Sequence, residues 1–324
     1  RLSRLHVMHH SCPLSRLSGM MVAFIRRLIL NDFHPQVTMQ NPTTMKTVLV
    51  TGCSSGIGRA IARHLHERDY RVFATARAES DVTSLQDEGL QSLQLDLADQ
   101  SSIDTAMSTV LDASGGELYA LINNGAYGQP GAVEDLPTDV LRRQFETNVF
   151  GTHELTRQVI PVMRRQGAGH IVQISSILGL VCLPYRGAYN ASKYALEALS
   201  DTLRLELAGS GVHVSLIEPG PITSSFRANA YAAFRKHIDA DQSAHRDAYA
   251  REVKRLQSNK PVPYTLPESA VVDKVVHALE SGKPKIRYPV TRPARVFSLL
   301  KRVLSDRMTD RVLHAASGHS RKRD

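Results

Sequence analysis

The sequence predicts an α/β fold in which helices cover both faces of a doubly wound parallel sheet, giving three layers in a single domain. From Lys46 onward, short runs rich in Val, Ile and Leu alternate with longer amphipathic segments. Continuous apolar runs are typical of parallel strands that are buried on both faces. No internal repeat or low-complexity segment interrupts the alternation.

The same alternation predicts the individual elements. Strands are expected at residues 47–51, 71–75, 91–95, 119–123, 170–175 and 213–218, with a last edge strand at 285–288. Helices are expected at residues 57–68, 80–88, 101–113 and 187–207, and a long amphipathic stretch covers 138–166. Sheets of this kind bind ligands at the carboxyl ends of their strands, so functional side chains are expected there.

The net charge of +9 is concentrated at the two ends of the chain. Residues 1–45 hold five Arg and one acidic residue, and residues 291–324 hold nine basic and three acidic residues. We expect residues 1–45 to lie outside the fold, residues 46–290 to form the α/β domain, and residues 291–324 to form a basic amphipathic tail. Basic ends can touch an anionic membrane or a nucleic acid, but they are more often simply solvated.

The first 31 residues contain no acidic side chain and are rich in Arg, Ser and His. This composition is that of a transit-type leader, or of an extension that precedes a start at Met39 or Met45. We favour the second interpretation, because Met45 directly precedes the first predicted strand. The apolar run at 19–24 is too short to span a bilayer, and no other segment predicts a transmembrane helix.

The cysteine and aromatic content excludes several classes of site. Cys12, Cys53 and Cys182 lie far apart and form no CxxC pair, which indicates free thiols in a reducing compartment and no metal site. We therefore expect a cytoplasmic protein. Trp is absent and other aromatic residues are scarce, so we expect no nucleic-acid partner.

A glycine-rich turn, Thr51–Gly58, follows the first strand and opens the first helix. Glycines at this point allow a pyrophosphate to approach the backbone at a helix N-terminus, whereas three glycines alone would mark only a tight turn. We interpret the turn as a dinucleotide site. Its expected cofactor-binding residues are Gly52, Ser54, Ser55, Gly56, Ile57 and Gly58.

The end of the second strand indicates which dinucleotide is bound. It carries Arg77 and no carboxylate that could bind a ribose 2′-hydroxyl, so we predict NADP (NADPH) as the cofactor. A solvated surface Arg with no ligand would give the same sequence pattern. Asp96 and Leu97 are expected to flank the adenine. Asn123 and Gly125 are expected to line the cofactor or support the sheet, and either pair also fits simple turn chemistry.

Tyr189 and Lys193 are spaced to lie on one face of a helix. An ammonium beside a phenol favours the phenolate, so the pair suits general acid/base chemistry on a carbonyl, although such pairs also occur by chance on solvated faces. Ser176 ends the fifth strand, where its hydroxyl would polarise a substrate oxygen, and Asn148 is expected to anchor a water. Backbone groups of Pro219, Gly220 and Ile222 would then hold a nicotinamide carboxamide.

These motifs, in this order and spacing from about Lys46 to Val290, resemble the short-chain dehydrogenase/reductase family. The resemblance implies a Rossmann fold and a catalytic tetrad. In that tetrad Tyr189 is the general acid/base, Lys193 lowers its pKa and binds the nicotinamide ribose, Ser176 orients the substrate and Asn148 holds a relay water. Residues 51–57, 189–198, 218–222 and 283–290 look most similar to bacterial NADP-dependent aldehyde reductases, and also to the retinol and hydroxysteroid dehydrogenase branch.

The chain departs from the family pattern at two places. Residues 123–126 read Asn-Asn-Gly-Ala where the family usually has Asn-Asn-Ala-Gly, a tolerable exchange of small residues. A Thr usually stands at the position of Ser224, and here Thr223, Ser224 and Ser225 are all candidates for the hydroxyl beside the nicotinamide amide.

The loops beyond the strands predict a small lipophilic carbonyl or alcohol as substrate. Their apolar residues are Leu178, Leu180, Val181, Leu183 and Tyr185. Residues 224–256 are helix-prone, with Phe226, Tyr231 and Phe234 on one face that forms either a lid packed on the core or a substrate wall. Residues 293–313 predict one basic amphipathic helix, which packs on the domain, lies on a membrane or joins subunits of a homo-oligomer.

We therefore expect an NADP-dependent oxidoreductase that interconverts a lipophilic aldehyde or ketone and its alcohol by hydride transfer. A β-ketoacyl reductase-type enzyme is one alternative, but it would need a basic patch near the site for an acidic carrier protein, and the basic excess lies in the tails. A non-catalytic NADP-sensing protein is another, but it would not need all four groups of the tetrad.

Overall fold

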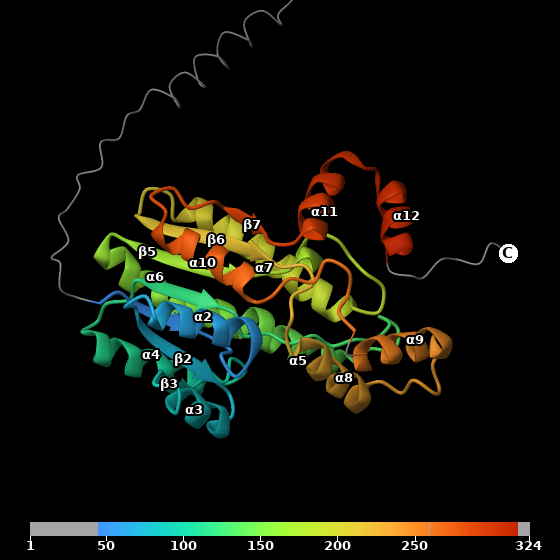
Figure 1. Ribbon diagram of the computed structural model, residues 1–324, viewed down its shortest axis with the longest axis horizontal. Coiled ribbons are helices and arrows are strands. Elements are labelled where there is room, and N and C mark those ends of the chain that lie inside the picture. Colours follow the sequence, from blue (N-terminus) through green and yellow to red (C-terminus); the bar gives the residue numbers. More distant parts are fainter. Residues whose placement is uncertain (1–44, 259, 317–324) are drawn as a thin grey trace, which may run out of the picture. The chain divides into compact units, whose positions relative to one another are not determined.

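The computed structural model describes residues 45–258 and 260–316 (Figure 1). Its centre is a seven-stranded sheet with the order β3-β2-β1-β4-β5-β6-β7, in which every strand pair is parallel. The strand order reverses between β1 and β4, so the predicted doubly wound parallel sheet is confirmed. The crevice at that reversal is where such sheets bind their ligands.

The strands lie within a few residues of the predicted ranges. They are β1 (Thr47–Val50), β2 (Arg71–Ala76), β3 (Gln91–Gln94), β4 (Ala120–Asn123), β5 (Gly169–Ile174), β6 (Val212–Glu218) and β7 (Arg287–Pro289). Helices connect them and cover both faces of the sheet. They are α2 (Gly56–His66), α3 (Glu79–Gln86), α4 (Gln100–Ser114), α5 (Thr138–Phe145), α6 (Thr152–Gln166), α7 (Gly187–Glu206) and α10 (Ser269–Glu280). The sequence had not singled out α10.

Alternating residues of the central strands point into two separate cores. In β1, Val48 and Val50 join one apolar cluster with residues of α2 and α10, whereas Leu49 joins a second cluster with residues of α4 and α6. All three side chains are fully buried. This period of two in a strand covered on both faces explains why its sequence is continuously apolar.

The long amphipathic stretch at 138–166 is not one regular helix. Between α5 and α6 the backbone forms a π-helical turn, η1 (Glu146–Gly151), which contains the predicted catalytic Asn148. Such turns are rare and are frequent at functional sites. Periodicity alone cannot locate this turn, because the apolar face continues through it.

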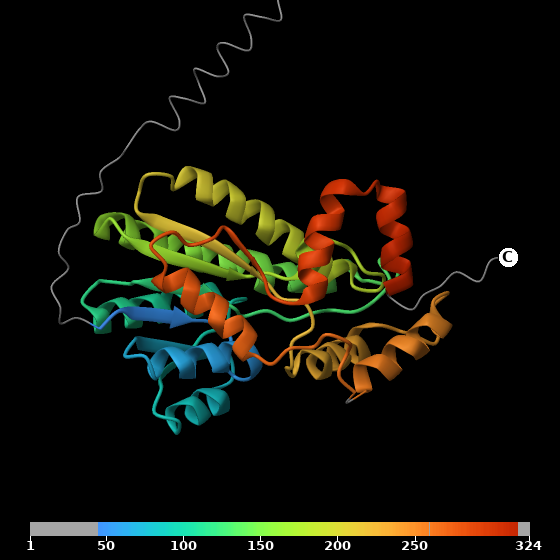
Figure 2. The ribbon, with the colours of Figure 1, turned by 45° about the horizontal axis from the view of Figure 1, so that its top comes forward.

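Two further segments, one expected to be helix-prone and one predicted as a single helix, are each divided into two helices. Residues 224–256 form α8 (Phe226–His237) and α9 (Arg246–Gln257), and the tail forms α11 (Arg292–Val303) and α12 (Asp306–Ala316). The prediction of one helix over 293–313 was wrong, because Leu304 takes an extended conformation with φ −88° and ψ 144°. Figures 1 and 2 show α8, α9, α11 and α12 beyond the end of the sheet where the strands finish.

The interpretations of residues 1–44, including Cys12 and a start at Met39, lie outside the described residues. Within the described part of the chain, Cys53 and Cys182 are both free thiols, the first buried and the second exposed. Among the described helices, none is both long and apolar enough to cross a membrane.

Candidate active site

The glycine-rich turn after β1 is packed so closely that side chains would not fit. Gly52 has φ +69°, and a Cβ there would lie 2.7 Å from Cα of Gly125. A Cβ on Gly58 would lie 2.3 Å from the carbonyl oxygen of Gly52. The turn therefore requires glycine for its own packing, and the exposed side of its backbone stays free of side chains.

The N-terminus of α2 is open to an anion. Its N-cap Ser55 accepts no hydrogen bond from the helix, and the first turn holds no acidic side chain. The first backbone N–H groups of a helix carry partial positive charge and need acceptors. Ser54 and Ile57 are half-buried on either side of this opening. The loop and the helix end together fit the pyrophosphate of a dinucleotide.

Asn124 holds the glycine-rich turn in place. Its side-chain amide donates to the carbonyl oxygens of Thr51 and Gly52 at 2.9 and 3.0 Å, and its backbone N–H donates to the Thr51 hydroxyl at 2.9 Å. The Asn123 amide instead donates to Thr156 on α6 at 2.9 Å. Neighbouring residues at a strand end face opposite sides of the sheet, so one Asn reaches the loop and the other supports a helix.

Arg77 follows β2 directly and is exposed. Among the described residues its guanidinium makes no hydrogen bond or ion pair. Asp96 lies in a turn after β3, where its carboxylate accepts from the N–H of Ala98 at 2.9 Å. Leu97 is buried, and a Cβ on Gly151 would lie 1.7 Å from the Leu97 carbonyl oxygen. Asp96 therefore makes the turn contact that was the alternative to flanking the adenine. Arg77 has a guanidinium with no hydrogen bond among the described residues, as a phosphate contact would need.

Tyr189 lies in the first turn of α7, next to Ser176 at the end of β5. Burial raises the pKa of Tyr189 to about 12, and a hydrogen bond with the Ser176 hydroxyl opposes that rise. Ser176 is itself buried, and its oxygen accepts from the N–H of Leu178 at 3.1 Å. The structure thus brings the predicted acid/base and the predicted polarising hydroxyl together, with the phenol in its protonated form.

Lys193 lies one turn further along α7 and is buried. Its ammonium donates to the carbonyl oxygen of Ile174 at 2.8 Å and lies 5.7 Å from the centre of the Tyr189 ring. Burial lowers the pKa of Lys193 to about 8, and the negative charge of Glu197 acts against this shift. A positive charge fixed this close favours the phenolate of Tyr189 over its uncharged form.

Asn148 is held by the backbone on one side and by α7 on the other. Its amide donates to the carbonyl oxygen of Tyr127 at 3.0 Å and to the Ser192 hydroxyl at 3.1 Å, and its own oxygen accepts from the Tyr127 N–H at 3.2 Å. These bonds place Asn148 beside Ser192, the residue before Lys193. Its role with a relay water stays a prediction.

Ser224 is the best placed of the three candidate hydroxyls after β6. A Cβ on Gly56 would lie 3.1 Å from Cβ of Ser224, so this serine faces the glycine-rich turn. Thr223 and Ser225 are both exposed. Pro219 and Gly220 are tightly packed. The carbonyl oxygen of Pro219 accepts from the N–H of Ile177 at 2.9 Å, and a Cβ on Gly220 would lie 2.1 Å from the Thr291 hydroxyl. Ile222 pairs with Leu266 in an isolated parallel bridge.

Phe226, the first residue of α8, covers Tyr189. Its ring packs edge-on against Tyr189 with 5.2 Å between ring centres, and it is 36% exposed. A Cβ on Gly128 would lie 2.6 Å from Cζ of Phe226. The three aromatic residues expected on one face separate here, because Phe234 is buried beneath α9 while Phe226 faces the site. Phe234 thus packs within the domain, whereas a role of Phe226 as a substrate wall stays a prediction.

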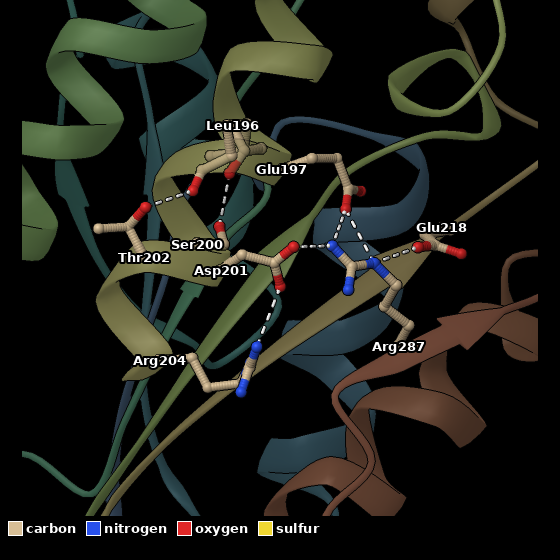
Figure 3. Close-up of polar contacts among 9 residues, drawn as sticks. Leu196, Glu197, Ser200, Asp201, Thr202, Arg204, Glu218 and Arg287 are labelled. Carbon is tan, nitrogen blue, oxygen red and sulfur yellow. Dashed lines mark hydrogen bonds and ion pairs between the residues drawn. The ribbon is translucent and has the colours of Figure 1, made fainter. Parts of the chain in front are cut away.

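A partly buried ion-pair cluster behind the site was not predicted from the sequence (Figure 3). Arg287 on β7 donates to Glu197 at 2.9 Å and to Asp201 at 2.7 Å, both on α7, and its Nε lies 3.1 Å from Glu218 Oε1 on β6. Glu218 is fully buried, and burial raises its pKa to about 7, with the charge of Glu197 adding to the rise. The single guanidinium of Arg287 thus offsets three carboxylates. One of them, Glu197, lies one helical turn after Lys193.

Comparisons with known proteins agree with this geometry. A family model described as short chain dehydrogenase matches residues 46–234. The uncharacterized oxidoreductase YbbO of Escherichia coli (strain K12) is 41% identical over 83% of this chain and 94% of its own length. The NADPH-dependent 3-dehydrocapnine reductase of Ornithobacterium rhinotracheale is 31% identical over 83% of this chain and 96% of its own.

The fold has close counterparts among solved structures. A short-chain dehydrogenase from Streptomyces avermitilis superimposes with a TM-score of 0.68 at 30% identity, covering 86% of this chain and 99% of that one. The chain therefore belongs to the short-chain dehydrogenase/reductase family and is an oxidoreductase that acts on CH–OH groups with a nicotinamide dinucleotide.

Proposed function

We propose that the protein interconverts a lipophilic aldehyde or ketone and its alcohol, using NADPH as the hydride donor. The observation that carries this proposal is that Tyr189 contacts both the Ser176 hydroxyl and the Phe226 ring. A polar pair on one side and an aromatic face on the other suit a carbonyl group attached to an apolar body. The neighbouring loop adds the apolar side chains of Leu178, Leu180, Val181 and Leu183.

The side chains divide the work of reduction as follows. The bound dinucleotide supplies the hydride that reaches the carbonyl carbon. The Ser176 hydroxyl donates a hydrogen bond to the carbonyl oxygen and holds it beside Tyr189. The Tyr189 O–H bond breaks and its proton passes to that oxygen, which gives the alcohol and a phenolate. The Lys193 ammonium stabilises the phenolate until a solvent proton restores it, and oxidation runs through the same steps in reverse.

Arg77 supports NADPH over NADH in this proposal. Its guanidinium has the free hydrogen-bond donors that a 2′-phosphate accepts, and no carboxylate ends β2. The related 3-dehydrocapnine reductase is described as NADPH-dependent. A replacement of Arg77 by Asp should therefore reverse the preference, because the new carboxylate repels the phosphate and accepts from a ribose hydroxyl.

The measurement for this variant is the ratio of kcat/KM with NADPH to that with NADH. We expect the ratio to fall by about 100-fold, since losing a bidentate charged contact costs roughly 2–3 kcal/mol. The control is Arg142→Asp, the same charge change on an exposed residue of α5. An unchanged ratio in Arg77→Asp would remove Arg77 from the 2′-phosphate site.

The substrate class is tested with the purified protein, NADPH and a panel of carbonyl compounds. The panel holds medium-chain aldehydes, retinal, ketosteroids, an acetoacetyl thioester and a polar sugar aldehyde, and absorbance of the reduced cofactor is followed. We expect kcat/KM to rise with the apolar length of the substrate. Turnover of the thioester alone would favour the β-ketoacyl reductase alternative, and cofactor binding without any turnover would favour a sensing protein.

We also propose that the protein works in the cytoplasm. Its support is that the two described cysteines, Cys53 and Cys182, are both free thiols. Burial raises the pKa of the Cys53 thiol to about 12, which makes this thiol unreactive. Fractionation of cells in which the chain is expressed, with and without a high-salt wash, would test this location.

A further inference from the structure

Helices α11 and α12 form an antiparallel pair (Figures 1 and 2), and each helix carries exposed apolar side chains. On α11 the exposed residues Val296, Leu299 and Val303 are spaced so that they share one side of the helix. Leu299 is 63% exposed and Val303 is 69% exposed. On α12 the exposed Met308 and Val312 lie one turn apart. We call these five side chains the tail face.

The tail face is separate from the side by which the pair packs on the domain. Ala294 and Leu313 are buried, and the Thr291 hydroxyl caps α11 by accepting from the N–H of Ala294. The Lys301 ammonium donates to the hydroxyl of Tyr194 on α7 at 3.1 Å. The pair is therefore docked by other residues, and packing within the described part of the chain does not explain five exposed apolar side chains.

Basic side chains border the tail face. On a helical projection Arg295 and Arg302 lie together along one edge of the apolar side of α11, and Arg307 and Arg311 lie together along one edge of that of α12. Residues 291–316 carry six basic and two acidic side chains. An apolar stripe bordered by Arg and Lys is the pattern of helices that lie in the interface of a membrane with anionic lipids.

We propose that the tail face binds to the surface of a membrane that contains anionic lipid. The apolar side chains enter the boundary between headgroups and acyl chains, and the arginines contact lipid phosphates. A second copy of the chain fits the face less well, because two faces with the same excess of positive charge repel each other. An acidic carrier protein would match the charge, but it would leave the apolar side chains without a partner.

The position of α11 links this surface to the active site. The helix packs against the short turn η2 (Ile177–Gly179), which follows Ser176 and begins the apolar loop beside Tyr189. Membrane binding through the tail face would therefore hold this loop near the source of lipophilic molecules. This part of the inference rests on the proposed function, whereas the binding surface itself does not.

The test is co-sedimentation of the full chain with vesicles of two compositions. One set is phosphatidylcholine alone, and the other is phosphatidylcholine and phosphatidylglycerol in equal parts. We expect binding to the anionic vesicles to exceed binding to the neutral ones by at least about tenfold and to weaken as salt is added. Equal binding to both sets, or binding to neither, would overturn the proposal.

Two sets of variants separate the apolar and the charged contributions. Leu299→Asp combined with Val303→Asp removes the centre of the tail face, and Arg295→Gln combined with Arg302→Gln and Arg311→Gln removes its border. Each set should lower the affinity for anionic vesicles by at least about tenfold. The matched control is Met45→Asp combined with Val262→Asp, which places the same change on exposed apolar residues elsewhere and should leave binding unchanged.

Further outcomes identify the other occupants. If Leu299→Asp with Val303→Asp converts a dimer to a monomer in light scattering while vesicle binding is unaffected, the face joins two copies and the proposal is wrong. Retention by an immobilised acidic acyl carrier protein without vesicle binding would overturn it in favour of a protein partner. Vesicle binding by a protein that shows no preference for lipophilic carbonyls would retain the surface and reject the proposed substrate class.

Discussion

Replacement of Tyr189 by Phe is expected to lower kcat by about 10²–10⁴-fold, the usual contribution of a positioned general acid. The Phe ring keeps the edge-on contact with Phe226 at 5.2 Å, so packing is preserved while the transferable proton is lost. Binding of the dinucleotide should change little, because the phenol reacts with the substrate oxygen. The measurements are steady-state kcat for reduction and the dissociation constant of NADPH by fluorescence.

The matched control for this variant is Tyr231→Phe. Tyr231 lies on α8, and its hydroxyl accepts from Gln257 at 2.8 Å on the surface. Removal of this hydroxyl should leave kcat unchanged. If Tyr189→Phe turns over as fast as the wild type, the phenol is not the proton donor and the mechanism proposed above is wrong.

Replacement of Arg287 by Met is expected to destabilise the fold by about 2–3 kcal/mol, less than the roughly 3–5 kcal/mol typical of a fully buried ion pair, because Arg287 and Asp201 are partly exposed. Met fills a similar volume, but it leaves Glu197 and the fully buried Glu218 with excess negative charge beside Asp201. For a domain of this size the unfolding midpoint should fall by on the order of 10 °C. Calorimetry or circular dichroism during heating measures this change.

The loss should depend on pH in a defined direction. Burial raises the pKa of Glu218 to about 7 in the folded protein, above the ordinary Glu value of 4.5. Between these two values the folded state binds more protons than the unfolded state, so stability falls as pH rises through this window. Without Arg287 the negative charges of the carboxylates are balanced even less. The loss of unfolding free energy in the Arg287→Met variant should therefore be smaller at pH 5 than at pH 8.

Arg204→Met is the control for the Arg287 variant. Arg204 also pairs with Asp201, at 3.5 Å, but unlike Arg287 it does not reach the buried Glu197 and Glu218, so its loss should cost less than about 1 kcal/mol. Equal effects of the two substitutions would show that Arg287 does not neutralise a buried acidic cluster. A loss for Arg287→Met that is the same at pH 5 and pH 8 would contradict the role assigned to Glu218.

The parts of the fold that were predicted correctly are those that local patterns specify. The alternation of apolar strands with amphipathic helices follows from burial on both faces, so it predicted the order of β1 to β6 and their bounds to within a residue or so. The glycine-rich turn and the spacing of Tyr189 and Lys193 depend on neighbours a few residues apart. They are visible in the sequence for that reason.

The breaks within helices were not predictable in the same way. The apolar face of 138–166 runs through the π-helical turn at Asn148 without a change of composition, and the division of the tail at Leu304 occurs in a continuous amphipathic pattern. Periodicity reports which side of a segment is buried. It does not report where the backbone leaves the helix.

The sequence by itself determined the fold class, the glycine-rich turn, and the placing of Tyr189 and Lys193 on one face of a helix, because each depends on residues close together in the chain. Only the tertiary structure decided which Asn holds the turn, which hydroxyl faces it, and that Phe226 covers Tyr189. It also joined Arg287 to Glu197 across 90 residues. Such contacts are made between strand ends and helices that the chain brings together only after folding, so no local spacing records them.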